Sequence, residues 1–275
     1  MERVWGHVLS GLTLVAGIGA AAGLVPACVH DNSTIFVSDV LFPPMVTAGM
    51  ACTFTAEPTQ PVLAQGKLDV GLSTTYRAVV LVGNQLVPRG DPNQPHTETS
   101  FVTIEGAVIR IVNSSGNQLG TYTQPTAATI PPSSGTTPGY ASIGVTLIDS
   151  ATAMTLSPPI GTTVPVVSYM RFFGHTLGGE SVESNEFGFP IEVCKACLID
   201  FSASDDPLLP QPNCANAGAT TMGSSSSSSS SSTSLPCFLG QDSPVPCAAC
   251  LRNPLCAGVV PLTASTPIVD AGGGG

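Results

Sequence analysis

The chain has 275 residues, and only 9 % of them are charged, whereas an ordinary soluble domain has about a quarter. Eighteen acidic residues against eight basic ones give a net charge of −10, and so few dispersed bases cannot form the patch that nucleic-acid binding requires. The scarcity of charge argues against a coiled coil or a helical bundle, and a hydrophobic fraction of 43 % argues against a wholly disordered chain.

The first 27 residues have the pattern of a secretory signal peptide. Residues 8–25 carry no charge, but the run is slightly shorter than the roughly 20 apolar residues that a spanning helix needs. The run is rich in glycine and alanine and small residues follow it, which is typical of a cleaved export signal. A retained N-terminal membrane anchor is the alternative that this pattern leaves open.

The end of this segment, Leu24-Val25-Pro26-Ala27-Cys28, resembles a bacterial lipobox. In lipoproteins the cysteine of the lipobox is acylated, so the resemblance makes Cys28 the candidate lipidation site and residues 28–34 a lipidated tether. Pro26 departs from the small residue usual at its position, and an ordinary signal peptidase can cut at the same bond. Cysteine parity favours lipidation, because setting Cys28 apart from the nine cysteines leaves an even number for disulfides.

The middle of the chain has the pattern of β-strands. Apolar and polar side chains alternate in residues 52–56, 68–72 and 187–193, as in strands with one buried face. Residues 78–82 are apolar throughout, which is typical of a strand buried on both faces. Pro190 cannot donate a backbone hydrogen bond and therefore predicts at least a local sheet edge.

The next expected strand, residues 101–112, contains a change of phase. The apolar residues before Gly106 and those after it alternate out of step, which predicts a β-bulge at that glycine. Further strands are expected over residues 119–123, 140–148 and 164–173. Asp149 is a good N-cap and predicts one or two helical turns after it.

Together these segments predict an all-β fold over residues 35–200, with about eight or nine short strands joined by turns. Their spacing favours a two-sheet sandwich of the immunoglobulin or fibronectin kind. A small disulfide-rich C-terminal segment is expected to follow it. A closed barrel is the alternative architecture.

Seven of the nine cysteines follow residue 193, and residues 201–260 are expected to form a cysteine-rich module. An unbroken serine tract, residues 224–232, interrupts the module as a flexible linker, and residues 261–275 are expected to be a disordered tail. The candidate disulfide cysteines are Cys52, Cys194, Cys197, Cys214, Cys237, Cys247, Cys250 and Cys256.

Two C-x-x-C pairs, Cys194 with Cys197 and Cys247 with Cys250, admit three interpretations. A zinc ribbon needs such pairs about 15 to 20 residues apart, and a thioredoxin-like site needs a βαβ setting. An export signal favours disulfides instead. Cys52 is the only candidate before residue 194, and we predict that it bonds to Cys194 or Cys197; a buried free thiol is the alternative.

The sequence contains no recognisable catalytic or cofactor motif. Nucleophile elbows, phosphate-binding loops and calcium loops are all missing, so no cofactor or metal is expected, and His175 is interpreted as a solvated turn residue. Glu180, Glu183 and Glu186 cluster loosely, and a second acidic loop lies at residues 205–206. A hydrolase that uses paired carboxylates is therefore an alternative function.

Residues 167–198 begin Val-Ser-Tyr-Met-Arg-Phe-Phe-Gly-His and end Ile-Glu-Val-Cys-Lys-Ala-Cys-Leu. Together with the lipobox, and with Cys-Phe-Leu-Gly-Gln-Asp before the last cysteines, this stretch resembles a group of predicted outer-surface lipoproteins typical of myxobacteria. The resemblance implies the cellular location and the architecture. The group has no assigned activity that the resemblance could imply.

These features predict an exported protein of the cell envelope, at the outer membrane or cell surface, held to the membrane through lipid on Cys28. We expect a structural or binding role without catalysis, with an envelope protein or a polysaccharide as partner and no nucleic acid. The alternatives are the exported hydrolase and a surface adhesin or ligand-binding module. The only tryptophan, Trp5, lies in the signal, which weakens the usual sugar-stacking form of an adhesin.

Overall fold

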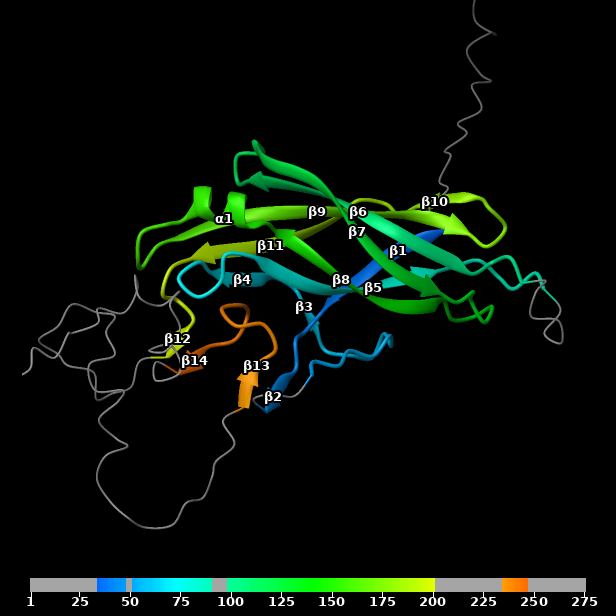
Figure 1. The fold of residues 1–275 in the computed structure, drawn as a ribbon, viewed down its shortest axis with the longest axis horizontal. Helices are drawn as coiled ribbons and strands as arrows, with labels where there is room; N and C mark the ends of the chain where they lie inside the picture. The colour runs from blue at the N-terminus through cyan, green and yellow to red at the C-terminus, as the bar shows by residue number, and fades with distance from the viewer. Residues whose placement is uncertain (1–33, 48–50, 91–97, 201–233, 247–275) are drawn as a thin grey trace, which may run out of the picture. The chain divides into compact units, whose positions relative to one another are not determined.

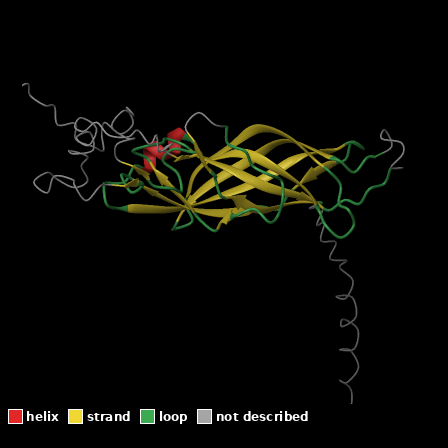
Figure 2. Ribbon diagram, turned by 90° about the horizontal axis from the view of Figure 1, so that it is seen from below, coloured by secondary structure: helices red, strands yellow, loops and turns green. Residues whose placement is uncertain are grey.

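The alternating segments of the chain form strands because every second side chain is buried in one shared core. A computed structural model describes residues 34–47, 51–90, 98–200 and 234–246, all of which belong to one compact unit, Ser33–Gly275. Figure 1 shows the order of the strands, and Figure 2 shows the same part of the chain from below, with its helix in red.

The first sheet has four strands in the order β3-β1-β5-β8, all paired antiparallel. They are β1 (Ile35–Leu41), β3 (Val62–Leu63), β5 (Tyr76–Asn84) and β8 (Gly139–Ile148). In the central strand β5, Val80, Leu81 and Val82 are all fully buried. The prediction of a strand covered on both faces is therefore confirmed for these residues.

The second sheet has the order β4-β11-β9-β6-β7, and β10 also pairs with β9. Its strands are β4 (Gly66–Asp69), β6 (Val102–Asn113), β7 (Gln118–Ile130), β9 (Thr163–Thr176), β10 (Ser181–Glu183) and β11 (Phe187–Cys194). Strand β4 runs parallel to β11 and begins its pairing at Ile191. Pro190 therefore has a strand partner in β9 but none on the side of β4, and the predicted local sheet edge is confirmed.

The two sheets enclose a common core, in which Tyr76, Phe172 and Phe189 are the largest buried side chains. Strands β1, β5 and β8 in one sheet and β6, β9 and β11 in the other follow the A-B-E and C-F-G order of an immunoglobulin-like domain. The predicted all-β, two-sheet sandwich is confirmed.

Two local predictions within the sandwich are also confirmed. The register of β6 against both of its neighbours shifts between Ile104 and Gly106, which is the predicted bulge. A Cβ atom at Gly106 would lie 2.5 Å from the ring of Phe173, so a side chain there would have to displace that ring. The helix α1 (Ser150–Leu156) is short and is capped by the side chain of Asp149.

One expected strand is wrong, because residues 52–56 form no strand. The half-buried residues in this segment instead make single tertiary contacts. Phe54 stacks on Phe238, with ring centroids 6.2 Å apart, and Cys52 forms a disulfide with Cys237. Contacts at every second residue thus imitate the alternation of a strand.

Two short ribbons complete the described structure. β2 (Met45–Thr47) pairs antiparallel with β13 (Ser234–Pro236), and β12 (Ile199–Asp200) pairs parallel with β14 (Val245–Pro246). Both ribbons use residues 234–246, which we call the strap. In Figure 1 the orange strap lies beside blue β2 at its start and yellow β12 at its end.

Candidate functional site

The strap joins parts of the sandwich that are far apart in the sequence. Near its start, Cys237 is disulfide-bonded to Cys52, with the two Cα atoms 5.8 Å apart. In its middle, the carbonyl of Gly240 accepts a hydrogen bond from the N–H of Asp69 at 2.9 Å. The strap therefore borders β4 on the side that β11 leaves open.

The side-chain amide of Gln241 makes the hydrogen bonds that a neighbouring strand would otherwise make to β5 at Arg77. Its Oε1 accepts from the backbone N–H of Arg77 at 3.0 Å, and its Nε2 donates to the carbonyl of the same residue at 2.8 Å. Strand β1 pairs with β5 only as far as Val80, so the strand pairing on this side stops before Arg77. The buried amide of Gln241 therefore satisfies two backbone groups that need partners.

Asp242 adopts a left-handed backbone conformation, with φ 59°, and its carboxylate binds two groups of the sandwich. The N–H of Lys67 donates to Oδ1 at 2.8 Å, and the hydroxyl of Tyr76 lies 2.9 Å from both carboxylate oxygens. Burial raises the pKa of Asp242 to about 6, although these hydrogen bonds act to lower it. Burial also raises the pKa of Tyr76, and the charge of Asp242 raises it further.

Asp69 organises the loop that follows β11. It is fully buried, and its two carboxylate oxygens accept from the N–H groups of Ala196 and Leu198, each at 2.9 Å. The loop between Cys194 and Cys197 is closed by a disulfide. A single buried carboxylate thus holds the first C-x-x-C loop beside β4.

The disulfides correct the predicted partner of Cys52. Cys52 bonds to Cys237, whereas Cys194 and Cys197 bond to each other. The prediction was wrong because the strap, and not the last strand of the sandwich, lies next to Cys52. The other candidates lie outside the described residues; they are Cys214, Cys247, Cys250 and Cys256. Disulfides of this kind indicate a location outside the reducing cytoplasm.

On the other side of the β5–β8 pair, side chains of β7 cap the edge of β8. The N–H of Thr146 donates to Oε1 of Gln124 at 2.9 Å, and the carbonyl of Thr146 accepts from the hydroxyl of Tyr122 at 2.7 Å. Thr146 is the register partner of Arg77. Side chains therefore cap both edges of this strand pair, Gln241 on one side and Gln124 with Tyr122 on the other, which blocks pairing with another strand.

A shallow hollow of about 200 Å³ lies against this capped pair of strands. Both strands, Gln124 of β7 and Phe238 of the strap line it. Arg77 is exposed, and its guanidinium forms no ion pair with an acid in the described part of the chain. The hollow thus places hydrogen-bond donors beside an aromatic ring.

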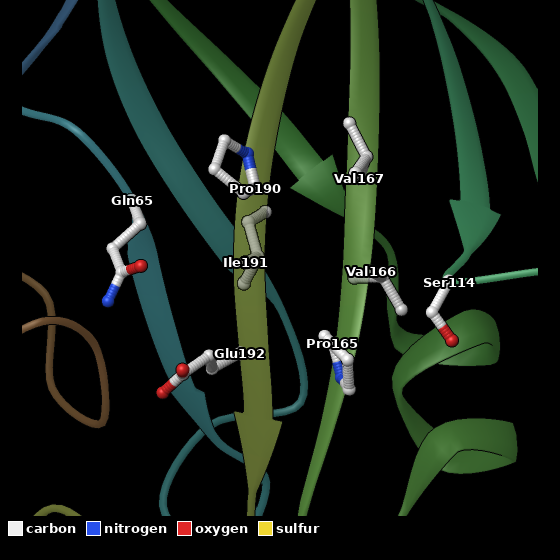
Figure 3. A pocket seen from close by; sticks show the side chains of 8 residues that line it. All are labelled: Gln65, Ser114, Pro165, Val166, Val167, Pro190, Ile191 and Glu192. Atoms are coloured by element: carbon white, nitrogen blue, oxygen red, sulfur yellow. The ribbon is translucent and has the colours of Figure 1, made fainter.

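A second hollow, of about 210 Å³, lies along strands β9 and β11 of the other sheet (Figure 3). Figure 3 shows Pro190 of β11 beside Val167 of β9, with Ser114 on the far side of β9. Its one charged residue, Glu192, pairs with Lys67 at 3.2 Å. This hollow is mainly apolar and offers no unpaired charge among the residues that line it.

The acids of the hydrolase alternative lie at and beside β10, exposed to solvent. Glu183 pairs with Arg171 at 3.2 Å, and Glu186 pairs with Arg110 at 2.7 Å. Neither hollow described above contains these acids or Glu180. Neither of these two hollows therefore brings the three carboxylates together.

His175 lies within β9 and not in a turn, because β9 continues to Thr176 to pair with β10. Its Nδ1 is 3.2 Å from Oε1 of Glu105. Within the described ranges, no group of three or more histidine, cysteine or acidic side chains is arranged to hold a metal ion. In those same ranges, no helix has the length and apolar character needed to cross a membrane. Cys28, residues 205–206 and the serine tract lie outside them.

No motif in the sequence marks the residues that hold the strap or line the first hollow as functional. Gln241 and Asp242 entered the sequence reasoning only as the end of the Cys-Phe-Leu-Gly-Gln-Asp stretch, which carried a resemblance and no role for either residue. Comparison of the sequence with protein-family models finds no match, and comparison with curated proteins finds none either.

Proposed function

We propose that this protein is an exported, lipid-anchored component of the cell envelope, at the outer membrane or cell surface, with a binding or structural role and no catalysis. The observation that carries the proposal is the Cys52–Cys237 disulfide, which fastens the strap to the sandwich. Bonds of this kind are typical of oxidising compartments and rare in the reducing cytoplasm, in agreement with the signal-like residues 1–27.

The anchor in this proposal is lipid on Cys28, the cysteine of the lipobox-like segment. Strand β1 begins at Ile35, so only the short tether of residues 28–34 separates the acylated residue from the sandwich. Each buried methylene of an acyl chain contributes about 0.8 kcal/mol, and two or more chains give stable anchoring. The same features support membership of the lipoprotein group, typical of myxobacteria, that residues 167–198 resemble.

Metabolic labelling with a fatty-acid probe tests the anchor. We expect the wild-type chain to carry label, Cys28→Ala to lose it, and Cys52→Ala to keep it as a matched cysteine control. Fractionation of the same cells should move Cys28→Ala from the membrane to the soluble fraction. Label retained by Cys28→Ala, or absent from the wild type, would overturn lipid anchoring.

A further inference from the structure

The hollow against the β5–β8 pair has a rigid base. Its backbone at Arg77 and Thr146 is fixed from both edges by the side-chain amides of Gln241 and Gln124. Gly144 lies two residues before Thr146 on β8, opposite Val79. It is exposed, and no atom lies within 4 Å of the position that its Cβ would take. The hollow therefore has an open base at Gly144 that no side chain fills.

The charged and amide groups of the hollow are hydrogen-bond donors. Arg77 contributes a guanidinium with five N–H groups and no acceptor, and none of the residues that line the hollow is acidic. The Oε1 atom of Gln124 is already bound to the N–H of Thr146, which leaves the Nε2 hydrogens of that amide without a partner in the described part of the chain. A lining with a guanidinium, a free amide N–H group and no acid favours an anionic, acceptor-rich ligand.

An apolar wall stands beside these donors. Phe238 lines the hollow and stacks on Phe54, with the two ring planes 15° apart, and Val79 contributes a half-buried aliphatic side chain. The volume of about 200 Å³ is below the roughly 300 Å³ at which sites for drug-sized molecules begin. The hollow is therefore matched to a single ring with one apolar face.

We propose that this hollow binds a hexuronate ring, the carboxylate-bearing sugar unit of an acidic polysaccharide. The guanidinium of Arg77 matches a carboxylate in a bidentate manner, the C–H face of the sugar packs against Phe238, and Gln124 and Thr146 bind ring hydroxyls. The site deepens the binding role proposed above. The sugar site is tested by binding measurements alone. A negative result there would leave the lipid anchor standing, and a negative labelling result would leave the sugar site standing.

The test is isothermal titration of the full chain with an oligogalacturonate, and with a neutral hexose oligosaccharide of the same length. We expect binding of the acidic oligosaccharide alone, and weaker binding as salt is raised. Arg77→Gln should bind at least about tenfold more weakly, because a charge-assisted pair is lost. Gly144→Val should also weaken binding, because its side chain enters the open base of the hollow.

Arg171→Gln is the matched control, because it removes a guanidinium that is already paired with Glu183 on the other sheet. This variant should bind like the wild type, and thermal unfolding should show that all three variants are folded. The proposal is overturned if the wild type binds neither sugar or binds both equally. It is also overturned if Arg77→Gln and Gly144→Val bind as tightly as the wild type, or if Arg171→Gln weakens binding as much as Arg77→Gln.

Discussion

The carboxylate of Asp242 is half-buried against a phenol and a backbone N–H, neither of which carries a positive charge. Its pKa rises to about 6, against an ordinary value of 3.8, because burial penalises the charged form. The folded state therefore binds this proton more tightly than the unfolded chain does. The resulting stability is fully present below about pH 3.8 and is lost as the pH rises through about 6.

We predict that Asp242→Asn flattens the dependence of stability on pH between about 4 and 6. The asparagine keeps an acceptor for Lys67 and Tyr76 but does not titrate. At neutral pH the variant should be more stable than the wild type by up to about 3 kcal/mol, since each pH unit between the two pKa values corresponds to 1.36 kcal/mol. Urea unfolding midpoints across this range measure the effect.

The control for this measurement is Glu180→Gln, which removes an exposed carboxylate and should leave the pH profile of the wild type in place. If Asp242→Asn keeps the wild-type slope, another group titrates in this range.

At the scale of single elements, β8 depends on the side chains of β7 to cover its edge. Gln124→Ala should lower the free energy of unfolding by about 1 kcal/mol, because the N–H of Thr146 loses its partner. The same change should speed hydrogen exchange at that one amide. Gln118→Ala, an exposed position at the start of the same strand, should change neither quantity, and equal effects of the two substitutions would contradict the capping role.

Some elements could be predicted because their causes are local. The bulge in β6 follows from a phase change around Gly106, and the start of α1 follows from the capping side chain of Asp149. Both signals lie within a few residues of the feature that they predict. The strand pattern over residues 35–200 indicated a sandwich for the same reason, since alternation shows which face of each strand is buried.

The strap could not be predicted, because its contacts are distant in the sequence. Gln241 binds Arg77, which lies 164 positions away, and Asp242 binds Lys67, 175 positions away. Local patterns show only that such residues are polar, not which backbone groups they satisfy. The predicted disulfide partner of Cys52 was wrong for the same reason. The closeness of Cys194 and Cys197 to the last strand does not indicate which segment of the chain covers Cys52.

At the scale of the whole molecule, the two disulfides differ greatly in the length of chain that they close. The Cys52–Cys237 bond spans 185 positions, and the Cys194–Cys197 bond spans 3. In the chain-entropy account, long loops give a disulfide more stabilising effect than short ones. The Cys52–Cys237 bond is therefore expected to contribute more to the free energy of unfolding than the Cys194–Cys197 bond.

We predict that replacing Cys52 and Cys237 together by alanine lowers the free energy of unfolding by about 5 kcal/mol, because the loop that they close is long. Replacing Cys194 and Cys197 together should cost about 2 kcal/mol and serves as the matched control. Guanidinium unfolding of the oxidised proteins measures both quantities. Equal losses would show that the strap is held by its hydrogen bonds and not by its covalent bond.

The late position of the strap also sets the order in which the chain matures. In a chain that is exported from its N-terminus, Cys52 reaches the oxidising compartment 185 positions before Cys237. Cys194 and Cys197 reach that compartment before Cys237 does, and they are the wrong partners for Cys52. Because they are only three positions apart, they can form a disulfide with each other first, and the thiol of Cys52 then stays free until Cys237 arrives. The segment around Cys52 thus has no covalent bond to the strap until residues 234–246 have been exported.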